Sequence, residues 1–361
     1  MTKPSVTYST NSHSKYKRND IFIKNEANNT IQEEHADRAD IVLPLIAIDG
    51  GGTNTISTIA NRRGNVLSKA EASTTNHQLI GKERTVKTLS ELILKNIQQL
   101  RNISPEYYSQ GKTVTFKIGV FALAGIDTQR DQLIVRRIVQ QVITNSNIRI
   151  EKIIVENDAL STLIGATNHT PGVLLASGTG SIAFGHDGKG NYVRSGGWGH
   201  ILGDEGGGYW IGKAAIQSIL KMYDGRGPKT MLSDLVLNHF GFKDHEELYD
   251  WVYGSDFTVN SVGELAKIVE EAFCLGDKVS EKILESATHE LSQLAFGVIR
   301  KLNISNQPLQ ILFLGGVLQN NEYIKKRVER NILNKVEEIE ILPNNQKPIH
   351  LILQRGLNEL R

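Results

Sequence analysis

The chain has 361 residues, 39% of them hydrophobic, which is enough for globular cores at a length where two domains are expected. Its formal net charge of +2 is too small to indicate nucleic acid or a membrane surface as a partner. The single cysteine, Cys274, excludes disulfides within the chain and multi-cysteine metal centres, which fits a cytoplasmic protein. No apolar run is long enough to span a membrane.

Residues 1–43 differ in composition from the rest of the chain. They are rich in Ser, Thr, Asn and Lys, and they contain neither an apolar core segment nor the apolar region of a secretory signal. We predict a disordered tail over residues 1–43, an N-terminal domain over residues 44–156 and a C-terminal domain with extra helices over residues 157–361.

Two similar successions of elements follow the tail. In the first, three strands precede a helix, a strand, a helix and a strand, at residues 45–49, 55–61, 66–72, 83–101, 116–124, 130–143 and 148–155. In the second, three short strands precede a mostly helical stretch and then a strand, a helix and a strand, at residues 172–177, 181–186, 192–195, 205–302, 309–314, 321–335 and 338–342. The pattern predicts an α/β protein made of two halves built alike.

A glycine-rich turn follows the first strand of the first half. Asp49 precedes three glycines and then Thr53, Asn54 and Thr55. Glycines allow a sharp turn whose N–H groups face a phosphate, with a cation such as Mg²⁺ between the phosphate and Asp49. A hairpin turn explains the same residues, because Asp-Gly between apolar runs is a strong hairpin signal.

The second half has a turn at the matching place. Residues 177–181 contain Gly178 and Thr179, and a third turn with Gly315 follows the strand at 309–314. A plain hairpin and strand–helix packing remain alternatives for these turns, but matching turns in duplicated halves favour a nucleotide site. The stretch 207–214 nearly fits a P-loop, but Ala214 lacks the required hydroxyl, and we do not predict a P-loop there.

An acid follows the strand at 148–155. Open α/β sheets bind ligands at the carboxyl ends of their strands, so Asp158 is a candidate general base. Asn157 or Asp158 could instead cap the next helix, which is a common reason for an acid at that place.

Two further loops carry candidate binding residues. The dense glycines of residues 196–206, around Trp198 and Asp204, indicate a loop packed against a ligand, although Asp204 and Glu205 could cap the next helix. Asn76 could bond a sugar hydroxyl or cap a helix.

Together these stretches resemble the actin-like sugar kinase and Hsp70 ATPase superfamily, and within it the N-acetylglucosamine kinases of the BadF/BadG/BcrA/BcrD ATPase family. The resemblance covers about residues 45–345, and its specific stretches are residues 75–77 and 197–206. The other matching motifs occur in the family's order, at residues 49–53, 124–127, 157–159, 177–181 and 314–317. The resemblance implies two duplicated ribonuclease-H-like domains with an interdomain cleft.

The resemblance also implies ATP and Mg²⁺ as cofactors, an amino sugar as substrate, and a homodimer. Asp49 would face Mg²⁺, and Asp158 would be the catalytic base. The implied ATP-binding residues are Gly51, Gly52, Thr53, Asn54, Gly178, Thr179, Gly315 and Gln319. The implied sugar-binding residues are Asn76, Gly125, Asp158, Gly197, Trp198 and Asp204.

We therefore expect a kinase that phosphorylates N-acetylglucosamine at O6, with N-acetylmuramic acid and glucosamine as alternative substrates. A BadF-type dehydratase activator would need four cysteine ligands for a cluster shared between subunits, and Cys274, expected to be buried in a helix, supplies two in a dimer. A sugar-sensing regulator would carry DNA-binding helices near its N-terminus, for which residues 1–43 show no apolar periodicity.

The chain departs from the family at both ends. It has a 44-residue N-terminal extension, and residues 347–353 stand where these kinases place a Gly-Ala-rich helix after a proline. That helix normally returns to the first domain, so we expect its loss or replacement to affect stability and activity.

Overall fold

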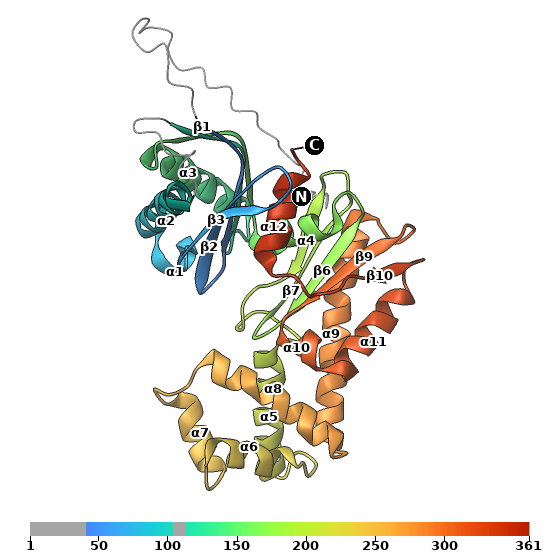
Figure 1. The fold of residues 1–361 in the computed structure, drawn as a ribbon. Coiled ribbons are helices and arrows are strands. Elements are labelled where there is room, and N and C mark those ends of the chain that lie inside the picture. The colour runs from blue at the N-terminus through green and yellow to red at the C-terminus, as the bar shows by residue number, and fades with distance from the viewer. Residues whose placement is uncertain (1–40, 104–112, 361) are drawn as a thin grey trace, which may run out of the picture. The chain divides into compact units, whose positions relative to one another are not determined.

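The computed structural model describes residues 41–103 and 113–360, which group into two compact units (Figure 1). The N-terminal unit contains the described residues up to 174, together with residues 309–314 and 339–360. The C-terminal unit contains residues 175–308 and 315–338. The predicted tail lies outside the described residues except for residues 41–43, which begin the first strand. Over the described part of the chain, no helix is long and apolar enough to cross a membrane.

The strands form two five-stranded sheets with the same order. The strands are β1 (Ile41–Gly50), β2 (Asn54–Ala60), β3 (Val66–Ser73), β4 (Val114–Leu123), β5 (Ile148–Glu156), β6 (Gly172–Ser177), β7 (Ser181–His186), β8 (Tyr192–Gly196), β9 (Leu309–Leu314) and β10 (Ile339–Ile341). The sheet orders are β3-β2-β1-β4-β5 and β8-β7-β6-β9-β10. Both sheets mix antiparallel and parallel pairs, with β1–β2 and β7–β8 antiparallel and β1–β4 and β9–β10 parallel. The repeated order confirms the predicted duplicated α/β fold.

Helices connect and cover these strands. They are α1 (His77–Ile80), α2 (Lys82–Ile103), α3 (Gln129–Asn145), α4 (Asp158–Thr167), α5 (Gly208–Tyr223), α6 (Leu232–Phe240), α7 (His245–Tyr253), α8 (Val259–Cys274), α9 (Lys278–Leu302), α10 (Gly316–Asn320), α11 (Glu322–Leu333) and α12 (Pro348–Leu357). The stretch predicted as mostly helical, residues 205–302, holds α5 to α9.

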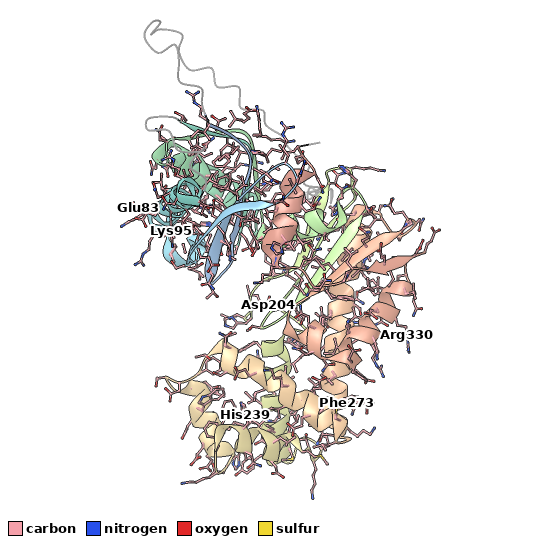
Figure 2. The ribbon with its side chains drawn as sticks, in the orientation of Figure 1. Glu83, Lys95, Asp204, His239, Phe273 and Arg330 are labelled. Atoms are coloured by element: carbon pink, nitrogen blue, oxygen red, sulfur yellow. The ribbon has the colours of Figure 1, made fainter. Side chains whose placement is uncertain are left out.

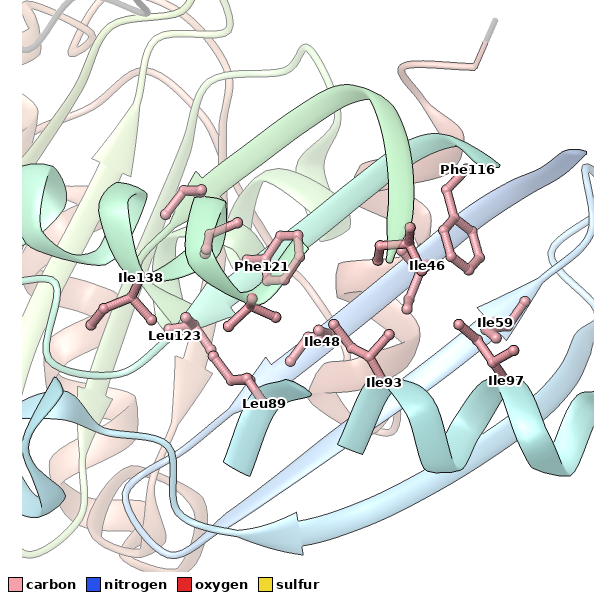
Figure 3. Packing of buried hydrophobic residues seen from close by; sticks show 14 of the residues in the cluster. Ile46, Ile48, Ile59, Leu89, Ile93, Ile97, Phe116, Phe121, Leu123 and Ile138 are labelled. Atoms are coloured by element: carbon pink, nitrogen blue, oxygen red, sulfur yellow. The ribbon is translucent and has the colours of Figure 1, made fainter. Parts of the chain in front are cut away.

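The first sheet, formed by β1 to β5, is covered by helices on both faces. Ile46 and Ile48 pack with residues of α2 and α3 on one face (Figure 3). Leu45 and Ala47 pack with residues of α12 on the other face. Successive side chains of a strand point to opposite faces, so β1 has to be apolar at nearly every position, which explains the continuous apolar run in the sequence.

Of the two expected alternatives for the C-terminal helix, loss or replacement, the structure shows replacement, by α12. Pro348 occupies the first turn of α12, where its missing N–H removes no helical hydrogen bond. Ile349, Ile352 and Leu353 are buried against the first sheet. The amphipathic spacing of these residues replaces the expected Gly-Ala-rich sequence, and the helix still returns to the first sheet.

The C-terminal unit places helices on β7 and β8 and against each other. Helix α9 packs on both strands, α11 packs on α9, and α5 packs on α8. A Cβ at Gly212 of α5 would clash with the Val262 carbonyl, so glycine permits this close helix crossing. Cys274 is the last residue of α8 and is exposed, so the expectation of a buried cysteine is wrong.

Candidate active site

Two acids lie at the carboxyl ends of two parallel strands of the first sheet, Asp49 in β1 and Asp158 just after β5. Strand β4 lies between β1 and β5, and Asp49 of β1 is paired in register with Ala122 of β4. Ala122 is also paired with Glu156, two residues before Asp158. The strand register therefore brings Asp49 and Asp158 to the edge where open α/β sheets bind ligands.

Burial and like charge make both acids weaker than ordinary aspartates. Burial raises the pKa of Asp49 to about 6, and the charge of Asp158 adds to the shift. Burial also raises the pKa of Asp158 to about 6, against the N–H of Ala159, and the charge of Asp127 adds to it. The two acids share an electrostatic environment that a cation or a protonated ligand group would relieve.

The first turn of α4 separates two roles that the sequence left open. Asn157 is the N-cap, and its Oδ1 accepts hydrogen bonds from the N–H groups of Ala159 (2.9 Å) and Leu160 (3.4 Å). Its Nδ2 donates to the Ile126 carbonyl at 3.4 Å. Because Asn157 provides the cap, the helix does not depend on Asp158 for it, although Asp158 Oδ1 also accepts from Ala159.

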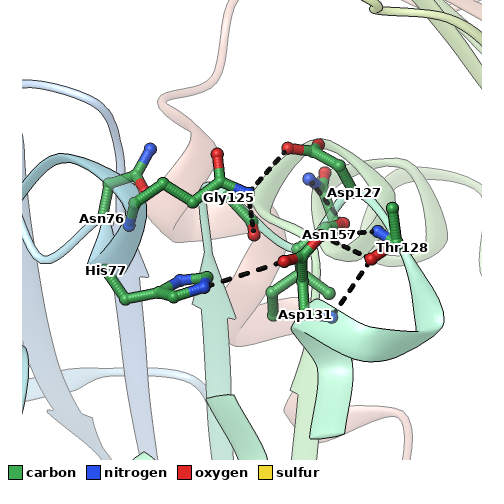
Figure 4. Close-up of polar contacts among 9 residues, drawn as sticks. Asn76, His77, Gly125, Asp127, Thr128, Asp131 and Asn157 are labelled. Carbon is green, nitrogen blue, oxygen red and sulfur yellow. Dashed lines mark hydrogen bonds and ion pairs between the residues drawn. The ribbon is translucent and has the colours of Figure 1, made fainter. Parts of the chain in front are cut away.

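Asn76 and Gly125 lie against each other beside this edge (Figure 4). Asn76 is the N-cap of α1, where its Oδ1 accepts from the Gln78 N–H at 2.9 Å, so the capping alternative is confirmed. Gly125 has a φ of 83°, and a Cβ there would clash with the Asn76 Oδ1. Glycine is therefore required at position 125 for its backbone conformation and for the room it leaves to Asn76.

Residues outside the predicted set complete this cluster. His77 is buried, and its Nε2 lies 3.8 Å from Asp131 Oδ1. Burial lowers the pKa of His77, against the charge of Asp131. Gln78 Nε2 donates to the Gly125 carbonyl (3.0 Å) and to Asp127 Oδ2 (3.4 Å). The motif at 124–127 contained Asp127, but only the strand order shows its proximity to Asp158.

Residues 51–53 form the loop of the hairpin between β1 and β2, so the hairpin alternative is correct as a description of the backbone. The Gly51 N–H donates to the Asn54 carbonyl at 3.0 Å, and Thr74 Oγ1 donates to the Gly51 carbonyl at 3.0 Å. Gly52 and Thr53 are exposed, and a Cβ at Gly52 would meet nothing within 4 Å. The loop is open to a ligand at Gly52 and Thr53.

Residues 178–180 form the corresponding loop between β6 and β7. The hydroxyls of Ser177 and Ser181 donate to the carbonyls of Gly206 (2.8 Å) and Glu205 (2.6 Å). Thr179 Oγ1 donates to Asn260 Oδ1 at 3.3 Å. The two serines therefore fasten residues 205–206 to the loop, a role that the sequence did not indicate.

Glycines pack backbone against backbone around this loop. The N–H of Gly208 donates to the Gly178 carbonyl at 2.7 Å, and the N–H of Tyr209 donates to the Thr179 carbonyl at 2.9 Å. A Cβ at Gly207 would lie 2.8 Å from the Gly180 Cα. Close packing within the protein thus explains the glycines before α5, and the helix is capped by Gly207 rather than by Asp204 or Glu205.

Gly315 and Gln319 lie at the end of β9 and in α10. Gly315 has a φ of 85°, and a Cβ there would clash with the Ser177 carbonyl. The Gln319 N–H donates to the Gly315 carbonyl at 3.0 Å, and its side chain is exposed. The structure therefore brings Gly315 against the loop that holds Gly178 and Thr179.

The loop of residues 196–206 contains three predicted residues, of which Asp204 is labelled in Figure 2. Gly197 has a φ of 69°, and Trp198, 63% exposed, lies under the Arg194 guanidinium at 4.4 Å. Asp204 has a φ of 59°, and its Oδ1 accepts from the Gly199 N–H at 3.2 Å. Burial raises the pKa of Asp204, against the Gly199 N–H. An aspartate in the left-handed region is strained, which is a common feature of functional loops.

The residues present fit a magnesium ion that is held mainly through a nucleotide. Among the described residues, no three His, Cys, Asp or Glu side chains gather in a way that would hold a metal. Mg²⁺ usually needs only one or two carboxylates together with substrate phosphates. Asp49 can supply such a carboxylate. Its side chain is half-buried, and burial and the charge of Asp158 raise its pKa, which a bound cation would oppose.

The sequence pattern of the BadF/BadG/BcrA/BcrD ATPase family matches residues 46–346. The chain belongs to this family. ATP use follows from membership in a family of ATPases. The match spans both sheets and both hairpin loops.

Similar proteins carry names of amino-sugar kinases. An N-acetylmuramic acid/N-acetylglucosamine kinase of Clostridium acetobutylicum is 35% identical over 280 residues, which are 78% of this chain and 87% of that protein. An N-acetyl-D-glucosamine kinase of Dictyostelium discoideum is 28% identical, over 84% of this chain and 94% of that protein. A solved structure from Chromobacterium violaceum, named as a proposed N-acetylglucosamine kinase, has a TM-score of 0.60 at 21% identity and covers 87% of this chain and 99% of that chain. This structural likeness shows that the present chain and the Chromobacterium violaceum protein share a fold.

Proposed function

We propose that the protein is a kinase that transfers the γ-phosphoryl group of ATP to a hydroxyl of an amino sugar, with N-acetylglucosamine as first candidate and O6 as the acceptor. Family membership and the names of the relatives support the reaction class. The observation that carries the proposal is the position of Asp49 and Asp158 at one edge of the first sheet.

Asp158 is the proposed general base. Phosphoryl transfer depends mostly on positioning and on charge stabilisation, and the enzyme's base orients the hydroxyl and accepts its proton. A carboxyl with a pKa of about 6 is ionised at neutral pH, yet it is a better proton acceptor than an ordinary aspartate. Asn157 fixes the helix start, so the carboxylate of Asp158 is presented from a rigid turn.

The nucleotide would be held by the two hairpin loops. In this proposal the exposed Gly52 and Thr53, and the loop at Gly178 and Thr179, face phosphates. Asp49 would hold Mg²⁺, which supplies positive charge against the phosphate oxygens when it is bound. Gly315, which packs against the backbone of Ser177 beside this loop, is assigned to the adenosine.

The sugar would be recognised by the remaining predicted residues. We assign this role to Asn76, Gly125, Gly197, Trp198 and Asp204. The relatives' names support N-acetylglucosamine and N-acetylmuramic acid as substrates, and glucosamine remains a third candidate.

The test of the proposed function is ADP release in a coupled assay with N-acetylglucosamine, N-acetylmuramic acid and glucosamine. We expect sugar-stimulated release that requires Mg²⁺ and is abolished by a chelator. Release that no amino sugar stimulates, from protein shown to be folded by its circular dichroism, would contradict the proposal. Mass spectrometry of the product would locate the phosphate.

The role of Asp158 is tested by Asp158→Asn. We expect turnover to fall at least about a hundredfold, the usual effect of losing a general base, with ATP binding kept. The matched control is Asp234→Asn, which changes an acid in the first turn of α6 and should leave turnover unchanged. Near-normal turnover of folded Asp158→Asn would refute the assignment of the base.

A further inference from the structure

A buried arginine lies behind the proposed base, and the proposed function gives it no role. Arg355 of α12 is 2% exposed. Its Nη2 and Nε donate to the two carboxylate oxygens of Glu156, at 2.9 and 3.3 Å. Its Nη1 donates to Glu359 Oε1 at 2.6 Å, and Glu359 is also paired with Lys152 of β5. Arg355, Lys152, Glu156 and Glu359 are thus linked in one network of ion pairs.

The arginine stays charged in this environment. Burial lowers the pKa of Arg355, but the charges and hydrogen bonds of Glu156 and then Glu359 outweigh it, and the net shift is upward. A buried guanidinium without these partners would be strongly destabilising. Burial of Arg355 therefore requires these carboxylate partners. The two-point contact with Glu156 fixes the orientation of the guanidinium.

The backbone around Arg355 leaves little room for movement. A Cβ at Gly356 would lie 2.5 Å from a Leu45 methyl group of β1. A Cβ at Gly165 of α4 would clash with the Leu351 carbonyl of α12. Helix α12 is thus packed closely on both the first sheet and α4, and the guanidinium starts from a fixed backbone.

The partner of this guanidinium is the last residue of β5. Glu156 is followed directly by Asn157, the cap of α4, and by Asp158. We infer that Arg355 is a positioning residue for the reaction, which acts through Glu156 to hold the end of β5 and so the carboxylate of Asp158. The inference rests on the proposed function for the role of Asp158, and on the structure for the contact.

A purely structural role of Arg355 predicts a different effect of the same substitutions. If Arg355 only fastened α12, removal of either carboxylate partner would lower stability and leave turnover unchanged. If Arg355 fixes the turn that carries Asp158, only the partner at the end of β5 should affect turnover. The chain offers this matched pair, since Glu156 and Glu359 bind the same guanidinium.

The experiment measures kcat and sugar KM for Glu156→Gln and Glu359→Gln at a temperature where both are folded. We expect Glu156→Gln to lower kcat by about tenfold or more, because a displacement of 1 Å in a catalytic group can reduce the rate by two orders of magnitude, and to change KM little. We expect Glu359→Gln to lose a similar amount of thermal stability and to keep kcat within about twofold, since the contact with Glu156 is intact. Equal kcat in both variants would overturn the inference.

The path through Glu156 is tested by a double-mutant cycle with Arg355→Lys. Lysine keeps the charge but not the two-point contact, so Arg355→Lys alone should lower kcat. In the Glu156→Gln background the same change should have little further effect, because residues that act through one contact are not additive. If the loss of kcat in the double variant equals the product of the two single losses, Arg355 does not act through Glu156.

A readout without activity separates this inference from the proposed function. Hydrogen exchange of the Ala159 and Leu160 amides, which donate to Asn157, should become faster in Glu156→Gln and not in Glu359→Gln. Unchanged exchange in Glu156→Gln would contradict the inference. Failure of the wild-type protein to phosphorylate any amino sugar would contradict the proposed function alone.

Discussion

The two hairpin loops occupy the same place in the two sheets but are held very differently. The loop of residues 51–53 is braced from outside the hairpin by the Thr74 hydroxyl, and Gly52 has open space around it. The loop of residues 178–180 is fastened by two serine hydroxyls, by Asn260 and by the first N–H groups of α5. The same turn is thus exposed in one unit and packed into the protein in the other.

The residues before the loops differ in the same sense. Asp49 is the second-last residue of β1, and the matching residue of β6 is Ala176. The two loops occupy equivalent positions but have different surroundings. The first follows an acid and is open at Gly52, whereas the second is tightly packed against backbone atoms. The difference fits the proposal that Mg²⁺ is held at the first loop, and it shows that the conformation of the second loop depends on the protein around it.

Gly315→Ala should have the largest effect, because it tests the packed loop. The methyl group would meet the Ser177 carbonyl, and alanine would be held at a φ of 85°. We expect a loss of roughly 3 kcal/mol or more in the free energy of unfolding, or failure to fold. Gly316→Ala is the control, since its Cβ would meet nothing closer than 3.7 Å in α10. Thermal unfolding that shows equal melting temperatures for both variants would contradict the comparison.

The two acids of the candidate site, Asp49 and Asp158, should make activity and stability respond oppositely to pH. Asp158 must be ionised to act as a base, so kcat/KM should fall about tenfold per pH unit below about pH 6. For both acids the pKa in the folded protein is raised above its unfolded value, so their ionisation destabilises the fold above about pH 6. That destabilisation is lost as the pH falls from 6 to 4.

The measurement is a melting curve of the wild type and of Asp49→Asn between pH 4 and pH 8. We expect the variant to be more stable than the wild type above pH 6, and the gap to close toward pH 4, because the neutral amide lacks the cost of a buried charge. The two acids interact, so the transition will belong to the pair. A gap that widens as the pH falls would refute the assignment.

A smaller effect separates the braces of the two loops. Ser177→Ala removes a buried hydrogen bond and leaves the Gly206 carbonyl without it, which should cost about 1–3 kcal/mol. Thr74→Val removes the half-buried brace of the open loop and should cost about 1 kcal/mol or less. Chemical denaturation measures both. An equal or larger loss for Thr74→Val would show that the first loop is held as firmly as the second.

Gly52→Ala should have the smallest effect on stability. Its Cβ points into open space, so we expect a change within about 0.5 kcal/mol, typical of surface substitutions. If Gly52 faces a phosphate, the ATP KM should still rise severalfold while sugar KM is unchanged. A marked fall in melting temperature would mean that the loop of residues 51–53 is packed like that of residues 178–180.

Local patterns predicted most strands and the longer helices to within a few residues. The apolar run at 43–48 and the helical spacing of 83–101 carry their own signals, because burial imposes a period of two or 3.6 on the sequence. The C-terminal helix was missed because the prediction relied on the family's Gly-Ala pattern. Its apolar residues Ile349, Ile352 and Leu353 have helical spacing of their own.

The candidate site was predicted by residue type and not by partner. Asp49, Asn76 and Asp158 stand in motifs that can be read directly, but each had a capping or turn alternative that only contacts could decide. Ser177, Ser181 and Arg355 were not predicted for their actual roles, because their partners lie 29, 24 and 199 residues away in the chain. No local pattern reports such pairings.

The sequence by itself determined the duplicated α/β order, the two glycine-rich turns and the acids at the strand ends, because these follow from periodicity, glycine conformation and motif spacing. The tertiary structure decided that Asn157 and not Asp158 is the N-cap of α4, which loop is open and which is packed, and how α12 meets β5. Those outcomes depend on strand register and on the burial of charge, which are properties of contacts between distant residues.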